Sequence, residues 1–356
     1  MTGRARRLEA PHRRPEPGSR LLEWVAVRAY RTASWVLGRI PPAIARLIVA
    51  GGAQLSYALW PTKRRWSNAN FGHVLSLPPG DRRVRQMAMR AYGEYARYIV
   101  ELMRLPRMDQ ADAVRMVDHD FLDTFEPLRA EMNQGLILAL GHVGNNEAVA
   151  AAVASRGYPI SVVADDSAFP ELYEDLRRMR EGWGVRLIPW RNLREIYGVL
   201  RRGEFLGLLV DWGYRPDGIP VRLFDAWTTL PAGPAALAAR TGARILPVTI
   251  RRDARDRFHV SWADPIEVPS TAPADLARAT QQLADALEAT IAAAPHQWYN
   301  FKPIWPETEE ESADLRGRAA AMLADEDSGT TGPRGPEAER ALPLGGDGSP
   351  AAAPAT

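Results

Sequence analysis

The apolar positions after residue 135 follow two patterns. Short continuous apolar runs alternate with longer stretches in which apolar residues recur every three or four positions. The first pattern is typical of strands buried on both faces of a parallel sheet, and the second of amphipathic helices. The predicted strands are 135–140, 159–164, 185–189, 205–210, 244–250 and 257–263. The predicted helices are 146–156, 170–181, 191–202, 232–241 and 273–293. This alternation favours an α/β sandwich, in which helices flank a mostly parallel central sheet that leaves room for antiparallel strands near its end.

The amino-terminal part has a different pattern, in which arginines interrupt apolar and aromatic residues. Residues 21–60 are predicted as two helices that Pro41-Pro42 separates, and residues 82–105 as a third. Helices with aromatic residues on one side and arginine on the other fit an interfacial segment lying along a membrane, and equally fit helices that cap the domain core. No run of about twenty uncharged apolar residues occurs, so no transmembrane helix is predicted. The first apolar stretch follows an arginine- and proline-rich lead, so no signal peptide is predicted either.

Composition divides the chain into three parts. Residues 1–20 are rich in Arg, Pro and Gly and are predicted to be disordered. Residues 21–306 are predicted to form one domain, with a helical portion at 21–118 and an α/β portion at 119–306. Residues 307–356 turn acidic and then Gly/Pro/Ala-rich, and we expect a flexible tail that the fold does not need.

Charge is distributed unevenly along the chain. Residues 1–120 contain 21 Arg and Lys against 10 Asp and Glu, whereas residues 307–356 contain 4 against 11. A basic amino-terminal third suits contact with anionic phospholipid or with nucleic acid, although a solvated helix surface explains the charge equally well. No aromatic recognition motif is interleaved with the basic residues, so we expect no nucleic-acid partner.

Several kinds of site are excluded by composition and spacing. The chain contains no cysteine, which excludes disulfides, thiolate metal sites and a cysteine nucleophile. His73, His119, His259 and His296 lie far apart without the spacing of metal ligands, so no metal site is predicted.

The candidate chemistry lies at residues 135–156, where a predicted strand turns into a helix. Glycines on either side of His142 permit a tight turn, and Asn145 or Asn146 can cap the helix that follows. His142 then lies at the carboxyl end of a strand, where open α/β sheets bind their ligands. Glu147 lies in the first turn of the helix, where the dipole favours negative charge. We interpret this stretch as the working site; the alternative is that His142 is an ordinary core residue.

Three further blocks follow the turn at His142. Asp211 ends a buried-looking strand on the side where α/β sites assemble, although a capping role in a loop explains it equally well. A Pro-Ala-Gly-Pro segment at 231–234 opens a small-residue helix that can pack close to a sheet or a ligand. The last block, at 294–301, reads Ala-Pro-His-Gln-Trp-Tyr-Asn-Phe.

Together these blocks resemble the bacterial lysophospholipid acyltransferase family, which includes the late acyltransferases of lipid A and the phosphatidylinositol mannoside acyltransferases. The family pattern Gly-His-x-Gly-Asn-Trp-Glu/Asp is matched by residues 141–147. Asp211, the Gly-Pro-Ala-rich block Gly233–Ala243 and the ending Pro295–Tyr299 follow in the family's order, and the resemblance covers residues 20–305. One position departs: Asn146 stands where the family has an aromatic residue, which changes the wall beside the histidine.

The resemblance implies an O-acyltransferase that needs no cofactor. It would move a fatty acyl group from an acyl-CoA or acyl carrier protein thioester to a hydroxyl of a membrane glycolipid or phospholipid, such as a lipid A-like or phosphatidylinositol mannoside-like acceptor. It also implies a peripheral protein at the cytoplasmic face of the bacterial plasma membrane, in contact with an anionic membrane surface.

The chemistry of acyl transfer fits His142 as general base. A hydroxyl attacks a thioester poorly until a base removes its proton, and histidine has a pKa near the working pH. A carboxylate beside the ring can fix its tautomer and stabilise the imidazolium. Ser155 and Ser161 lack the Gly-x-Ser-x-Gly elbow of a nucleophile, so we favour direct attack by the acceptor hydroxyl without an acyl-enzyme.

Supporting roles are implied for the carboxylates. Glu147 is expected to hold the site together, either through His142 or by pairing an arginine. By position in the family pattern that arginine is Arg180, with Arg177 as second choice and an exposed helix arginine as the alternative. Asp211 is the other carboxylate that can contact His142.

The developing oxyanion also needs hydrogen-bond donors. Backbone amides around Gly144 and Asn145 are the candidates.

Two other functions remain open. An esterase or thioesterase would use the same His142 with water as the acceptor. A lipid-binding protein of the membrane would keep the fold without activity, although the presence of His142 and Glu147 argues against it.

Overall fold

The computed structural model describes residues 17–118, 121, 123, 125–127, 135–166 and 169–324, with side chains from residue 23 onward. A six-stranded sheet forms the centre, in the order β3-β2-β4-β1-β7-β8. The strands are β1 Leu136–Leu140, β2 Ile160–Ala164, β3 Val185–Pro189, β4 Phe205–Leu209, β7 Arg244–Arg252 and β8 Phe258–Trp262. All neighbouring pairs are parallel except β7 and β8, which are antiparallel. The predicted α/β class and the antiparallel strand near the end are confirmed.

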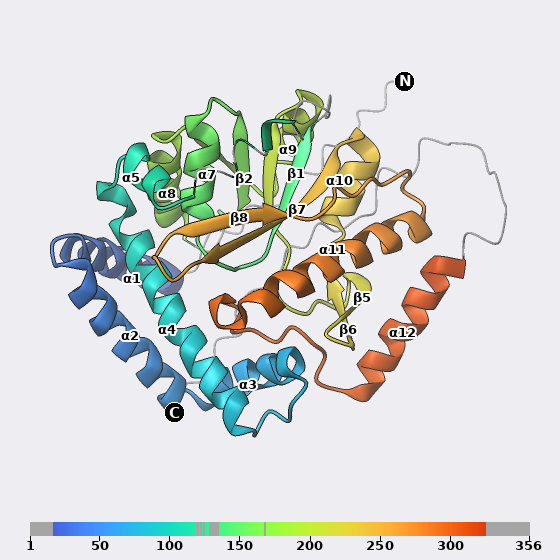
Figure 1. Ribbon diagram of the computed structural model, residues 1–356, viewed down its shortest axis with the longest axis horizontal. Coiled ribbons are helices and arrows are strands. Elements are labelled where there is room, and N and C mark those ends of the chain that lie inside the picture. The colour runs from blue at the N-terminus through green and yellow to red at the C-terminus, as the bar shows by residue number, and fades with distance from the viewer. Residues whose placement is uncertain are drawn as a thin grey trace.

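Helices cover both faces of this sheet (Figure 1). They are α7 Asn146–Ser155, α8 Pro170–Glu181, α9 Leu193–Arg201, α10 Gly233–Thr241 and α11 Pro273–Ala293. Side chains of β1 alternate between two apolar clusters: Ile137 belongs to the cluster with α10 and α11, and Leu138 to the cluster with α7. Burial on both faces explains why these strands have continuous apolar runs.

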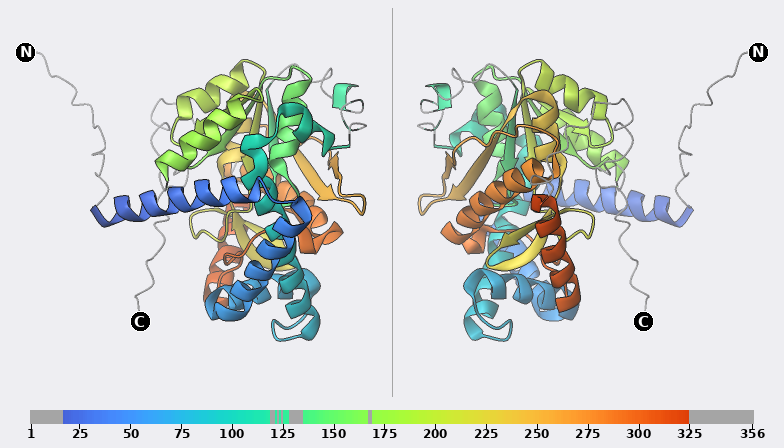
Figure 2. Two further views of the ribbon diagram at one scale, coloured as in Figure 1. Left: turned by 90° about the vertical axis from the view of Figure 1, so that its left-hand side faces the viewer. Right: turned by 90° about the vertical axis from the view of Figure 1, so that its right-hand side faces the viewer.

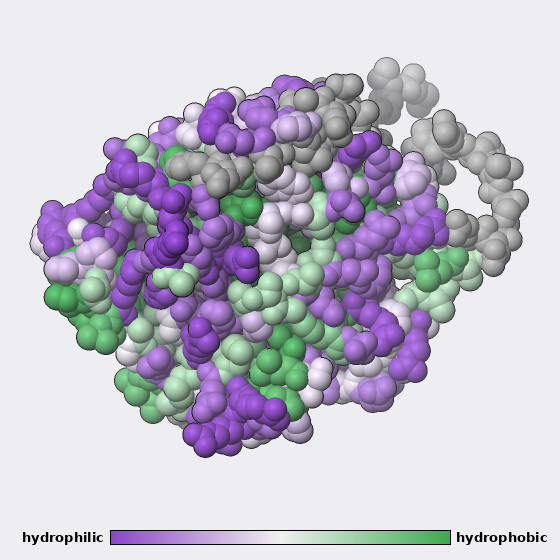
Figure 3. Space-filling model, viewed as in Figure 1, coloured by the Kyte–Doolittle hydropathy of each residue, from purple (hydrophilic) through white to green (hydrophobic). Residues whose placement is uncertain are grey.

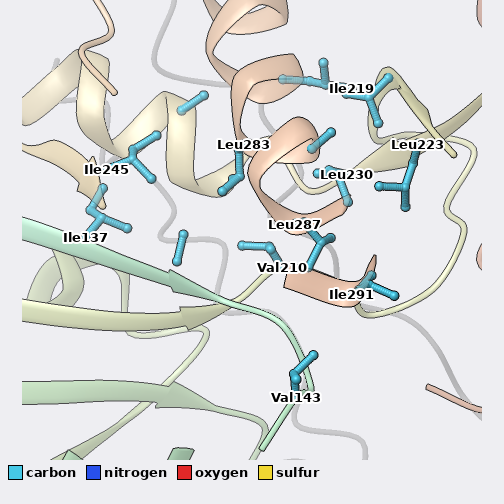
Figure 4. Close-up of a cluster of buried hydrophobic side chains, with 14 of the residues drawn as sticks. Ile137, Val143, Val210, Ile219, Leu223, Leu230, Ile245, Leu283, Leu287 and Ile291 are labelled. Carbon is cyan, nitrogen blue, oxygen red and sulfur yellow. The ribbon is translucent and has the colours of Figure 1, made fainter. Parts of the chain in front are cut away.

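Figure 4 shows the first of these clusters. Leu283 and Leu287 of α11 face the sheet residues Ile137 and Ile245. Val210, just beyond β4, packs in the same cluster and is buried. The core therefore extends to the carboxyl ends of β1 and β4, where it fixes the loops that follow them.

The helices before the sheet lie along one side of the molecule (Figure 1), and the last of them packs on α7. They are α1 Pro17–Leu37, α2 Pro42–Leu59, α3 Pro61–Leu75, α4 Arg82–Arg104, the short 3₁₀ helix η1 Leu105–Arg107 and α5 Gln110–Arg115. The break between α1 and α2 falls at the predicted prolines, whereas α3 is an addition to the prediction. Figure 2 shows α1 projecting beyond the rest of the fold.

No single helix of the described residues is both long and apolar enough to cross a membrane. The helices α2 and α3 meet the criteria of length and composition only as a pair, and that pair is bent by 95°.

A hairpin of β5 Ile219–Leu223 and β6 Ala226–Leu230 was not predicted. Its two turn residues, Phe224 and Asp225, have φ of 49° and 59°. Two-residue hairpin turns with positive φ at both positions normally carry Asn-Gly or Asp-Gly, and Pro220 within the first strand weakens the strand pattern further. The sequence therefore lacks the usual signals of a hairpin at this position.

The expected boundaries of the two ends need correction. The helix α1 begins at Pro17, inside the lead predicted to be disordered, and residues 1–16 lie outside the described residues. In the predicted tail, Glu309–Ala324 forms helix α12, which packs on α11 and the hairpin with Leu315 fully buried. Thr308 caps this helix by accepting from the backbone N–H of Glu311 at 3.2 Å. The cap and the apolar contact outweigh the acidic composition, and residues 325–356 lie outside the description.

Candidate active site

His142 and Asp211 meet at the carboxyl ends of adjacent parallel strands. His142 follows β1 and Asp211 follows β4, and these two strands pair along their whole length. The Nδ1 atom of His142 lies 2.6 Å from Oδ1 of Asp211. The backbone N–H of His142 also donates to Oδ2 of the same carboxylate at 2.9 Å. The Asp211 carboxylate is therefore the histidine's partner, as one of the two predicted arrangements required.

The segment after α11 holds this pair from behind. The indole Nε1 of Trp298 donates to Oδ2 of Asp211 at 2.8 Å, and the Asn300 amide donates to the backbone carbonyl of Asp211. The backbone N–H of Tyr299 donates to the carbonyl of His142 at 2.8 Å. Trp298 is completely buried and Asp211 is 2% exposed, so water does not compete for these bonds.

The environment sets opposite pKa directions for the two partners. Burial alone would lower the pKa of His142, but the charge of Asp211 and its hydrogen bond outweigh burial and raise that pKa above its usual value. Burial would raise the pKa of Asp211, but His142 and the hydrogen bonds from its backbone and from Trp298 hold that pKa below its usual value. Asp211 thus stays ionised and accepts from Nδ1–H, which leaves Nε2 of the neutral ring free to accept a proton.

Glu147 pairs with Arg180 rather than with the histidine. Nε of Arg180 donates to Oε2 of Glu147 at 2.8 Å, and a second bond joins Nη2 to Oε1. Both side chains are only 12% exposed. Arg177 instead pairs with Glu174 and Glu181 along its own helix. The predicted partner is therefore the one the structure shows, and the pair ties the start of α7 to the end of α8.

The turn between β1 and α7 requires the residues found there. Gly144 has φ of +69°, and a Cβ added to it would lie 2.5 Å from the carbonyl oxygen of Ile250. Only glycine fits that position. Asn145 is the helix cap, because its side-chain oxygen accepts from the backbone N–H groups of Glu147 and Ala148 at 3.1 and 3.2 Å.

Comparison with known proteins decides the family. A sequence model described as bacterial lipid A biosynthesis acyltransferase matches residues 16–307. The chain belongs to this family. A phosphatidylinositol mannoside acyltransferase of Mycolicibacterium smegmatis is 29% identical over 301 residues, which cover 82% of this chain and 93% of the relative. A phosphatidylinositol mannoside acyltransferase of Mycobacterium tuberculosis is 30% identical over 260 residues, which cover 70% of this chain and 80% of the relative. The protein is accordingly an acyltransferase of lipid biosynthesis.

A buried ion pair supports the turn between β1 and α7, and the sequence analysis did not predict it. Nδ2 of Asn145 donates to Glu101 at 2.9 Å, and Glu101 pairs with Arg252 at 2.6 Å. Glu101 lies in α4 and Arg252 at the end of β7, so three elements meet behind the turn. A glutamate within an amphipathic helix gives no signal of such a contact.

An aromatic wall stands beside the catalytic histidine candidate. The ring of Trp212 meets that of His142 edge to face, with centroids 5.7 Å apart, and is 48% exposed. The departure at Asn146 leaves an amide that points back to the Gly141 carbonyl at 3.4 Å. The immediate aromatic neighbour of the histidine thus comes from the loop after β4.

The other histidines that the structure describes do not form a metal site with one another. His73 stacks on Trp305, and His259 pairs with Asp118 and Asp253. His119 lies outside the described residues. Within the described part of the chain, no group of three or more His, Asp or Glu has the arrangement of metal ligands.

Proposed function

We propose that this acyltransferase moves a fatty acyl group from a thioester to a hydroxyl of a membrane glycolipid, with a phosphatidylinositol mannoside-like lipid as the favoured acceptor class. The observation that carries the proposal is the His142–Asp211 pair, whose imidazole remains 30% exposed while its partner is buried. The choice of acceptor rests on the two mycobacterial relatives, which are phosphatidylinositol mannoside acyltransferases. A lipid A-like acceptor is the second candidate, because the family model is described by lipid A biosynthesis.

The proposed mechanism is direct transfer with His142 as general base. Nε2 takes the proton of the acceptor hydroxyl as its oxygen attacks the thioester carbonyl carbon. The imidazolium that forms is stabilised by the Asp211 carboxylate at 2.6 Å. The C–S bond then breaks, and the imidazolium returns the proton to the leaving thiolate, which restores neutral His142. Ser155 donates to the carbonyl of Ala152 within α7, which supports a route without an acyl-serine.

The surrounding residues position this chemistry. We assign Glu147 and Arg180 the role of holding α7 and α8 together beside the turn. Backbone amides around Gly144 and Asn145 are the proposed donors to the oxyanion, because the turn carries them past the histidine at the carboxyl end of β1.

The test is product analysis with the purified full chain. A thioester with a labelled acyl chain is offered with vesicles that contain phosphatidylinositol mannoside, lipid A precursor or only neutral phospholipid. We expect label in an ester of one glycolipid, formed only when that lipid is present. Label appearing solely as free fatty acid at saturating acceptor would instead establish a thioesterase. Running acyl-CoA and acyl carrier protein side by side identifies the donor.

We further infer peripheral attachment to the cytoplasmic face of the bacterial plasma membrane through α1 and α2. Figure 3 shows apolar patches at the lower left, on the side where these helices lie. The exposed large apolar side chains of these helices, together with that of Trp60, which follows α2, are Trp24, Val25, Trp35, Val36, Ile44, Leu47, Ile48, Leu55, Leu59 and Trp60. The guanidinium of Arg39 lies 3.8 Å from the Trp35 ring centre, so basic groups accompany the apolar ones. Apolar burial and attraction to anionic lipid then act together.

Replacing Leu47 and Leu59 by serine together should detach the protein from anionic vesicles. These side chains are 75% and 72% exposed, so their loss removes membrane contact without opening the core. Each leucine buried in the membrane contributes about 1.5–3 kcal/mol, so the two together should make vesicle affinity fall by about 10²- to 10⁴-fold. Vesicle co-sedimentation measures this, with Leu323→Ser in α12 as the matched control. High salt should weaken the wild-type attachment in part; unchanged sedimentation of the double variant would rule out α2 as the contact.

A further inference from the structure

This chain has a lysine, Lys302, close to its candidate active site. Lys63 and Lys302 are its only lysines. Nζ of Lys302 lies 4.7 Å from the ring centre of Trp212, whose ring in turn lies 5.7 Å from that of His142. Nζ of Lys63 lies 4.7 Å from the ring centre of Trp66 and 5.9 Å from that of Trp60. Each ammonium group thus lies within cation–π distance of a tryptophan ring.

The segment that carries Lys302 is fixed to both the site and α3. Asn70 of α3 donates to the carbonyl of Lys302 at 2.7 Å and accepts from the backbone N–H of Ile304 at 3.3 Å. The backbone N–H of Lys302 donates to Asn300 at 3.2 Å, and Asn300 holds the carbonyl of Asp211. Asn70 is almost fully buried, so this connection is shielded from water.

The same arrangement directs Lys63 toward this segment. Lys63 and Asn70 are seven residues apart in α3, which places them on one side of the helix about 10 Å apart along its axis. Lys63 therefore lies on the side of α3 that contacts residues 300–304.

The charges of the two lysines are not neutralised within the described part of the chain. No carboxylate is among the influences on the pKa of Lys63, and neither lysine belongs to any ion pair there. Burial lowers the pKa of Lys63, and the positive charge of Lys302 lowers it further. After burial and Asp211, the charge of Lys302 also acts on His142, whose pKa it lowers. Two mutually repelling cations, one of them near His142, favour an anion from outside the chain.

We propose that Lys63 and Lys302 bind the phosphodiester of the acceptor lipid's headgroup and so present its hydroxyl to His142. This assignment rests on the proposed acyl transfer to a phosphate-bearing lipid. The acceptor is favoured over the donor because Lys63 lies in the first turn of α3, which follows Leu59 and Trp60, both exposed at the end of α2. Exposed tryptophan is typical of the headgroup level of a membrane, where a lipid phosphate lies.

Lysine footprinting tests the site without requiring turnover. An amine-reactive reagent modifies only Lys63, Lys302 and the amino terminus, and peptide mass spectrometry reads each position separately. The probes are glycerophosphoinositol, myo-inositol without phosphate, coenzyme A and inorganic phosphate. We expect glycerophosphoinositol to protect both lysines at concentrations at which the other three do not. Stronger protection by coenzyme A would assign the lysines to the donor, and equal protection by inorganic phosphate would show an unspecific anion site; either result overturns the proposal.

Variants separate this site from the acyl transfer itself. Hydrogen bonds to a charged group are worth about ten- to hundredfold in binding, so Lys302→Gln should raise the KM for the acceptor by that factor, and Lys302→Arg should restore it. Arg65→Gln removes an exposed positive charge from the same helix and should leave the KM unchanged. If wild-type enzyme transfers acyl groups but the headgroup protects neither lysine, the phosphate site is wrong and the transfer proposal stands. Protection without any transfer would support the phosphate site and contradict the proposed acyl transfer.

Discussion

Replacing His142 by alanine will abolish acyl transfer while the protein stays folded. General-base catalysis contributes roughly 10²- to 10⁴-fold, and the loss of the group that also protonates the leaving thiolate should bring the rate to the detection limit. The fold should survive because the other bonds of the Asp211 carboxylate come from the His142 backbone N–H and from Trp298, and both remain after the substitution.

Single-turnover transfer and thermal unfolding of the same preparation measure the two parts of this prediction. His142→Gln serves as a second variant, because its amide can still donate near Asp211 but cannot act as a base. The rate should be equally low in both variants, and the unfolding temperature should stay close to that of the wild type. A folded variant that transfers at a rate near the wild type would contradict the general-base mechanism.

Much of the site was accessible from sequence because it depends on local geometry. The carboxyl ends of neighbouring parallel strands must meet at one edge of the sheet, so His142 and Asp211 could be expected to approach once β1 and β4 were recognised. Gly144 and Asn145 likewise followed from the needs of a tight turn and a helix cap. The choice of Arg180 over Arg177 came from the family pattern rather than from helix periodicity, since both arginines lie in α8.

What the sequence concealed depends on contacts between distant segments. Trp298 and Asn300 reach Asp211 across 87 and 89 positions, and Glu101 reaches Arg252 across 151. Such contacts are set by the packing of whole elements, which periodicity does not encode. The prediction missed helix α12 for another reason. Its acidic and alanine-rich composition is shared with disordered tails, and only its packing on α11 distinguishes this helix from such a tail.

Exchanging Asp211 for asparagine should cause a loss of comparable size and move the pH profile of transfer. Oδ2 of Asp211 accepts two N–H groups, so the oxygen of the new amide will stay there and its NH₂ will face Nδ1 of His142. An NH₂ donating to Nδ1 favours the tautomer with the proton on Nε2, which cannot accept a proton from the acceptor. We expect kcat/KM to fall by an amount on the order of 10²- to 10⁴-fold.

The direction of the pH shift follows from the role of the charge. His142 works as a base only when neutral, so activity rises with pH through its pKa. Asp211 holds that pKa above its usual value, and removing the charge lowers it. The acid limb of the residual kcat/KM should therefore move to lower pH in Asp211→Asn. A rate–pH profile over the acid limb, recorded beside the wild type, measures it.

Glu147→Gln provides the contrast, since Glu147 pairs with Arg180 and the charge beside the imidazole remains in place. Its acid limb should stay where the wild type has it, while stability or acceptor affinity declines because Arg180 is left largely buried without its carboxylate. Adding Arg180→Gln should then cost little more than Glu147→Gln alone, because partners in one pair are not additive. If the acid limb of the pH profile moves in Glu147→Gln and stays in place in Asp211→Asn, the roles assigned to the two carboxylates must be exchanged.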